Sequence, residues 1–97
     1  MIYVVARMEI KEGCMPAMKA LLAKTVPIVR AENGCISYTP CVDVEGDVEK
    51  YITFVESWES QEALKAHLAS AHMAEFRTVA NTLRFNSEVK VLSPAEL

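Results

Sequence analysis

The spacing of the apolar residues changes abruptly after Trp58. Before this residue, Ile52, Phe54 and Trp58 have the even spacing of one face of a β-strand, and after it the apolar residues up to Ala71 recur at the spacing of a helix. Ser60, between the two patterns, is of a type that favours a helix N-terminus. The sequence therefore predicts a strand that turns at once into a helix. This turn draws Glu56, Trp58 and both histidines, His67 and His72, toward one crevice.

The same two periods extend along the rest of the chain. Strands are predicted over residues 2–10, 35–44, 49–58 and 87–92. One helix should run from Pro16 to the stop signal at 32–34, and another should begin at Ser60, restart at Ser70 and end at Asn86. This order, βαββαβ, predicts a single ferredoxin-like α+β domain over residues 1–97, in which helices cover one side of an antiparallel four-stranded sheet.

Two prolines and one turn refine this prediction. Pro27 lies inside the first helix, where it should kink the last turns or end regular hydrogen bonding. Pro40 cannot donate to a strand ladder, so its strand should be at an edge or bulged. Residues 45–47 are interpreted as a tight connection, which predicts that the strands on either side of it pair as a hairpin.

The apolar content suggests a second buried surface. Hydrophobic residues make up 52% of a chain of 97 residues, although small domains bury proportionally little of their surface. If the helices cover one side of the sheet, the other side remains largely apolar. We expect a homodimer that packs through this sheet face. The residues assigned to the face are Tyr3, Val5, Arg7, Cys35, Thr53, Val55, Val89 and Val91.

Charge and cysteine content exclude several classes of protein. The net charge is −3, and the signs are interspersed with no basic cluster, which argues against nucleic acid and anionic membranes as partners. No apolar run approaches the ~20 residues of a membrane span, and no basic region precedes the first apolar stretch, as a signal peptide requires. The three cysteines include no C-x-x-C pair, so neither a disulfide framework nor a zinc site is indicated and a reducing cytoplasm is favoured.

Each cysteine is interpreted as a small apolar residue or, alternatively, as a reactive thiol. Cys35 and Cys41 have the even spacing that would place both on one face of a strand.

The predicted crevice contains candidate acid–base residues. Glu56 lies on the face that the helices should cover, where a carboxylate must be hydrogen-bonded; it is either a structural residue or one that orients a histidine. His67 lies at the edge of an apolar helix stripe, as a structural histidine or as a base with an unperturbed pKa of ~6.5. His72, in the first turn of a helix, is either exposed or a neutral imidazole in a site. Tyr38 offers a phenolic donor.

Four large side chains could form the walls of the crevice. Trp58 is core by default and alternatively a flat wall against an aromatic ligand. Phe54, Met73 and Phe76 have the same two interpretations, since apolar residues at helix and strand spacing more often form core than a pocket.

Three stretches resemble the antibiotic biosynthesis monooxygenase (ABM) domain family, which includes quinol monooxygenases. They are ARMEIKEG at 6–13, ENGCISY at 32–38, and ESW at 56–58 with the serines and histidines that follow it. The resemblance implies a dimeric α/β barrel. It also implies one of several activities: oxygenation of quinols or anthrone-like aromatics without metal or flavin, haem degradation, or isomerisation of a phosphorylated sugar-like molecule. The haem-degrading branch has asparagine where this chain has Ala6, which argues against haem.

The resemblance implies a role for each candidate residue. His67 would be the catalytic base, oriented by Glu56. Tyr38, with His72 or Arg7, would stabilise a phenolate. Trp58, Phe54, Met73 and Phe76 would line a dry slot for a small aromatic substrate and for molecular oxygen as co-substrate, with no other cofactor. A sugar-like isomerase using the same base and a binding module without turnover remain alternatives.

Overall fold

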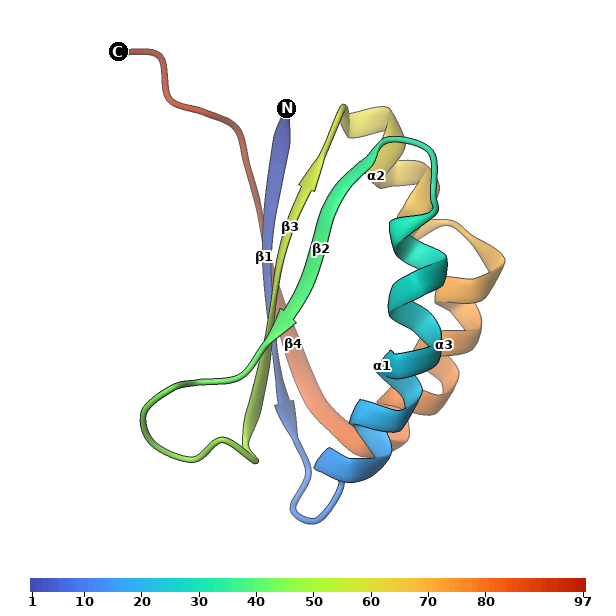
Figure 1. Cartoon of the computed structure of the whole chain (residues 1–97), viewed down its shortest axis with the longest axis vertical. Helices are drawn as coiled ribbons and strands as arrows, with labels where there is room; N and C mark the ends of the chain where they lie inside the picture. Colours follow the sequence, from blue (N-terminus) through green and yellow to red (C-terminus); the bar gives the residue numbers. More distant parts are fainter.

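The four strands form one antiparallel sheet, and all three helices lie on the same side of it (Figure 1). The computed structural model describes residues 1–97. The elements are β1 (Ile2–Ile10), α1 (Met15–Arg30), β2 (Cys35–Cys41), β3 (Tyr51–Trp58), α2 (Gln61–Leu68), α3 (Ala71–Leu83) and β4 (Arg84–Leu92), and the strands lie side by side as β2-β3-β1-β4. This is the predicted ferredoxin-like fold. None of its helices combines the length and apolar content needed to cross a membrane.

Two serines set the start of α2 and α3, as predicted. The Ser60 hydroxyl accepts a hydrogen bond from the Ala63 N–H at 3.1 Å, and the Ser70 hydroxyl accepts one from the Met73 N–H at 3.4 Å. Each bond satisfies one of the free N–H groups of a first helical turn. The second helical region is therefore divided, and the chain changes direction between His67 and α3.

Several element boundaries differ from the prediction. Helix α1 continues past Pro27 to Arg30, because a proline close to the C-terminal end removes only one backbone bond. The connection between β2 and β3 spans residues 42–50 and is not a tight turn, although the two strands do pair antiparallel. Strand β4 begins at Arg84, so Asn86 lies within the strand. Pro40 is on the edge strand β2, as predicted.

The helix-facing side of the sheet forms the core with α1, α2 and α3. A cluster of 17 buried apolar residues includes Ile52, Phe54 and Trp58 of β3. Glu56, between them in the alternation, is also buried. The predicted burial of this face of β3 is therefore confirmed.

The opposite face of the sheet differs from the predicted one at three positions. Val89 and Val91 lie opposite Ala6 and Val4, which places both valines on the helix-facing side. Cys35 lies opposite Trp58 and packs against the core. The reason is that β4 alternates between valines on one side and charged residues on the other, and its valines complete the apolar inner face.

All three cysteines are free. A register shift between Cys35 and Ser37 places Cys41 opposite Thr53, on the other side of the sheet from Cys35. The expectation that Cys35 and Cys41 share one face is therefore wrong.

Candidate functional site

A cavity of about 150 Å³ lies between the helix-facing side of the sheet and the helices α2 and α3. Val89 and Val91 of β4 border it and stay half-exposed, so the cavity is least covered along that strand. Most of the predicted site residues border this cavity: Arg7, Tyr38, Phe54, Glu56, His67, Met73 and Phe76. The fold therefore brings together residues from β1, β2, β3, α2 and α3.

His67 is buried in the wall of this cavity. Its Nδ1 lies 2.9 and 3.1 Å from the two carboxylate oxygens of Glu32, the second residue after α1. The expected partner, Glu56, makes no hydrogen bond to it, so the prediction of an orienting Glu56 is wrong. The Nε2 atom makes no hydrogen bond, although every fully buried side-chain nitrogen in the structure has one. Nε2 is therefore not fully buried, and because Nδ1 is turned toward Glu32, we assign Nε2 to the cavity that His67 borders.

Two aromatic rings hold the imidazole in place. The Trp58 ring lies 4.6 Å from the His67 ring, between centroids, and the Tyr38 ring meets it edge-on at 5.8 Å. Trp58 is fully buried and does not border the cavity, so the expectation that it would be a wall of the slot is wrong. It lies behind His67, where a large flat ring fixes the plane of the imidazole.

Glu56 is tied to Trp58. The Trp58 Nε1–H donates to the Glu56 Oε1 at 2.9 Å, because residues two apart on a strand point to the same side. Burial raises the pKa of the Glu56 carboxyl, the Trp58 bond opposes this rise, and the Glu32 charge adds to it. Glu56 thus borders the cavity as a second carboxyl group that makes no hydrogen bond to the Glu32–His67 pair.

His67 is held in the form that accepts a proton. Burial lowers its pKa below the ordinary value, and the His72 and Arg77 charges act in the same direction. The hydrogen bond and negative charge of Glu32 oppose this effect but do not overcome it. The imidazole is therefore neutral at neutral pH, with Nδ1–H donating to Glu32 and Nε2 free.

Tyr38 offers a hydroxyl group that keeps its proton. Burial raises the pKa of its phenol well above the usual range, and the charges of Glu56 and Glu32 raise it further. Its ring packs on Phe54 with centroids 5.4 Å apart. A phenol that does not ionise is a hydrogen-bond donor at every working pH.

His72 does not border the cavity. Its Nε2 contacts Glu32 and lies 3.3 Å from the Ser70 hydroxyl. It borders a separate surface hollow of about 180 Å³, on the other side of His67. The reason is that Met73, the next residue of α3, borders the cavity, and successive residues of a helix point in different directions. The expected placement of His72 at the same cavity as His67 and Tyr38 is therefore wrong.

Three arginines border the cavity, but the guanidinium of the predicted one, Arg7, does not point into it. The Arg7 guanidinium pairs with Asp43 at 3.1 Å and stacks on the Tyr51 ring at 3.9 Å, on the outer side of the sheet. Arg77 and Arg84 border the cavity as well. Arg84 is the first residue of β4. The sequence prediction starts this strand at Ser87, so it leaves Arg84 outside the strand and does not find it as a site residue.

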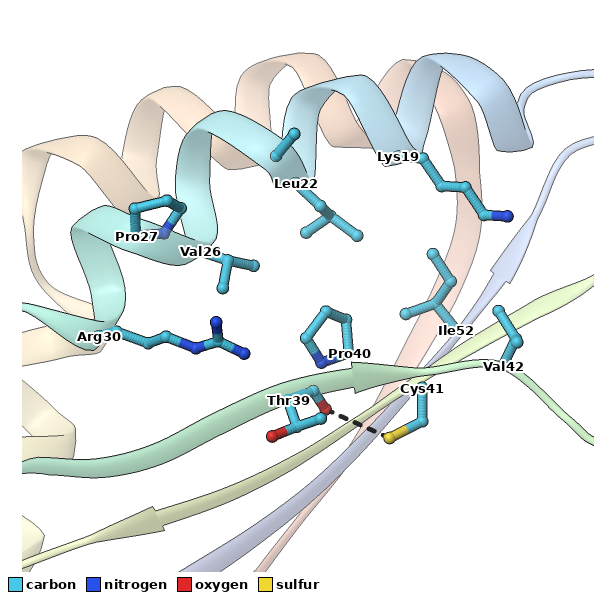
Figure 2. A pocket seen from close by; sticks show the side chains of 11 residues that line it. Lys19, Leu22, Val26, Pro27, Arg30, Thr39, Pro40, Cys41, Val42 and Ile52 are labelled. Carbon is cyan, nitrogen blue, oxygen red and sulfur yellow. Dashed lines mark hydrogen bonds between the residues drawn. The ribbon is translucent and has the colours of Figure 1, made fainter.

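A larger hollow of about 450 Å³ lies between α1 and β2 (Figure 2). Its walls include Leu22, Pro27 and Pro40, and Figure 2 shows Lys19 and Arg30 toward its two ends. No histidine or carboxylate borders it. Acid–base chemistry is therefore assigned to the cavity that His67 borders, although that cavity is the smaller of the two.

Comparisons with known proteins agree with this fold. The family model described as "Antibiotic biosynthesis monooxygenase" matches residues 1–79. The relative "Probable quinol monooxygenase YgiN" of Escherichia coli (strain K12) is 30% identical over 102 residues, which cover 97% of this chain and 98% of that protein. The structure of Rv0793 from Mycobacterium tuberculosis matches with a TM-score of 0.86 at 29% identity, covering 99% and 96% of the two chains. Protein SO0527 from Shewanella oneidensis matches with a TM-score of 0.84 at 33% identity, covering 94% and 87%.

Proposed function

Since this chain belongs to the antibiotic biosynthesis monooxygenase family, we propose that it oxygenates a small quinol or phenol. Molecular oxygen is the co-substrate, and no metal or organic cofactor takes part in the reaction. One observation carries the proposal. His67 is neutral, is fixed by Glu32, and presents its free Nε2 to a largely apolar cavity.

The first step is removal of the phenolic proton. His67 Nε2 accepts it, and the imidazolium that forms is stabilised by the Glu32 carboxylate on Nδ1. Tyr38 and Arg84 border the same cavity, and in this proposal their hydroxyl and guanidinium groups stabilise the phenolate oxygen. Arg84 takes the part that the sequence interpretation gave to Arg7.

The second step uses the electrons of the substrate itself. A phenolate is electron-rich, and the quinol supplies all four electrons that oxygen takes up. A quinol plus O₂ gives a hydroxyquinone plus water, so one oxygen atom enters the ring and the other leaves as water. The apolar side chains of Phe54, Met73 and Phe76 exclude competing water from this reaction.

The size of the cavity favours a single ring. Its volume is about 150 Å³, and a cavity of about 150 Å³ lined by apolar side chains accepts benzene. A polycyclic substrate would have to open the site further along β4, where Val89 and Val91 are only half-covered. We therefore favour a one-ring quinol over an anthrone.

The proposal includes a homodimer in the cytoplasm. On the outer side of the sheet, Tyr3, Val5 and Val55 are 42%, 37% and 48% exposed, and Val5 pairs with Val55 across the two central strands. Exposed apolar side chains at the centre of a sheet favour packing against another sheet. The three free cysteines agree with a reducing compartment.

Val55→Glu should convert the dimer to a monomer. A carboxylate at the centre of the interface would be buried without a partner charge, whereas in the monomer it faces water. Light scattering after size exclusion would give twice the chain mass for the wild type and the chain mass for the variant. Val79→Glu is the matched control, because Val79 on α3 is 47% exposed and lies away from the sheet. A wild type that is already monomeric would contradict the dimer.

Oxygen uptake tests the proposed reaction. Metal-stripped protein would be given a panel of one-ring quinols, naphthoquinols and anthrones, and uptake above autoxidation would be measured. His67→Ala should lower the rate by about 10²- to 10⁴-fold, the usual worth of a general base, whereas Glu75→Gln, on the exposed side of α3, should not change it.

The other outcomes separate the alternatives. Uptake that persists in His67→Ala would keep the oxygenase and discard His67 as its base. No uptake with any compound would favour an isomerase that uses the same base, or a binding module.

A further inference from the structure

Glu32, His67 and His72 bring three metal-ligating side chains together beside the apolar cavity. One donor atom of each lies within 4.8 Å of the other two. Glu32 follows α1, His67 is in the last turn of α2, and His72 is in the first turn of α3, so the cluster joins three helices. We propose that these three residues bind a divalent transition-metal cation of the zinc type.

The donor atoms fit such an ion in kind and in spacing. Zinc takes imidazole nitrogen and carboxylate oxygen at about 2.0–2.2 Å, which places two donors of a tetrahedral site about 3.3–3.6 Å apart. His67 Nδ1 is 2.9 and 3.1 Å from the Glu32 oxygens, and His72 Nε2 contacts the same carboxylate. Calcium and magnesium prefer oxygen ligands and would be poorly served by two imidazoles.

The site is held firmly and is accessible. The side chains of His67 and Glu32 are 3% and 14% exposed, whereas that of His72 is 27% exposed and has room to adjust. The surface hollow of about 180 Å³ opens directly onto all three residues. It provides a path for the ion and space for a water molecule as fourth ligand, as in zinc sites with three protein ligands.

Coordination would change what His67 presents to the cavity. A metal ion needs the Nδ1 lone pair, so the imidazole proton must then reside on Nε2. Nε2 faces the cavity and would donate a hydrogen bond there, with no capacity to accept a proton. This consequence, unlike the binding itself, rests on the proposed function: the cation would inhibit the oxygenase by occupying its base.

Direct zinc titration tests the site without relying on activity. Metal-free protein would compete for Zn²⁺ with a chromophoric chelator, and one ion per chain is expected. His72→Ala and Glu32→Gln should each weaken binding by about 100-fold or more, because even residues that only orient a ligand are worth about 10- to 100-fold. Both substitutions leave the apolar core intact, and circular dichroism would confirm that the variants are folded.

Two controls separate this site from adventitious binding. Glu75→Gln removes an exposed carboxylate on α3, and Cys35→Ser removes the thiol closest in sequence to Glu32; neither should change the affinity. Equal affinity in the wild type, His72→Ala and Glu32→Gln would overturn the proposal, as would a loss confined to Cys35→Ser. Inhibition of oxygen uptake at the zinc concentrations that fill the site tests the consequence, and an absence of uptake would leave the binding result unaffected.

Discussion

Glu32→Gln should reduce oxygen uptake by about 100-fold or more, since holding a comparable histidine in the wrong tautomer costs a serine protease about 10⁴-fold. The carboxylate of Glu32 can only accept a hydrogen bond, so it keeps the proton of neutral His67 on Nδ1 and leaves Nε2 free. A glutamine can turn its amide N–H₂ group to Nδ1, which would place the proton on Nε2. The base would then face the substrate in a form that cannot accept a proton.

The pH profile distinguishes this role from a purely structural one. Glu32 raises the pKa of His67 through a hydrogen bond and a negative charge, against the larger lowering by burial. Removing both contributions lowers the pKa further, so the acid limb of the residual activity should move to lower pH. A base is active above its pKa, and activity is lost as the pH falls through it.

Two other glutamates serve as comparisons for Glu32. Glu56→Gln should leave the acid limb where it is, because Glu56 bonds Trp58 and has no part in the His67 shift. Glu62→Gln, on the exposed side of α2, should leave the rate unchanged. If Glu56→Gln shifted the acid limb and Glu32→Gln did not, Glu56 and not Glu32 would be the carboxylate that sets the pKa of the base, and the assignment of Glu32 would be wrong.

The choice between these two glutamates shows where sequence reasoning fails. Glu56 is two residues from Trp58 on a strand, so periodicity places both on one face, and the structure confirms it. Glu32 lies in a turn that was interpreted only as a helix stop. A turn has no period, so no pattern along the chain could predict that its side chain meets α2 and α3.

The same distinction holds for the fold. Hydrophobic periods and capping serines determined the order of the elements and the break at Ser70, because these are local effects. The register of β4 depends on which face must complete the core, and the assignment of Val89 and Val91 to the outer face was wrong for that reason. Arg7 does lie on the outer face that its strand period predicts, so its guanidinium pairs with Asp43 and is turned away from the cavity. His72 was misplaced, because a position in the first turn of a helix does not say which way the side chain points.

Gly34→Ala should destabilise the fold by about 2–5 kcal/mol, the sum of about 1–2 for a left-handed residue and about 1–3 for overpacking. Gly34 has a φ of +85°, and a Cβ atom there would lie 2.5 Å from the Cβ of Ala63. Its carbonyl accepts the Glu59 N–H at 2.8 Å, which joins the turn after α1 to the turn before α2. The close approach therefore cannot relax without moving the helix that carries His67.

Gly13→Ala isolates the backbone part of this effect. Gly13 has a φ of +78°, but a Cβ atom there meets nothing within 4 Å, so only about 1–2 kcal/mol should be lost. Urea unfolding at one fixed protein concentration would measure both variants, because the stability of the proposed dimer would depend on concentration. Adding Ala63→Gly to Gly34→Ala removes the close contact and should restore the stability that overpacking costs. The recovery should be smaller by about 1 kcal/mol, because glycine destabilises a helix by that amount. Equal losses in the two alanine variants, with no recovery in the double variant, would show that the turn after α1 does not pack against α2 as tightly as the structure has it.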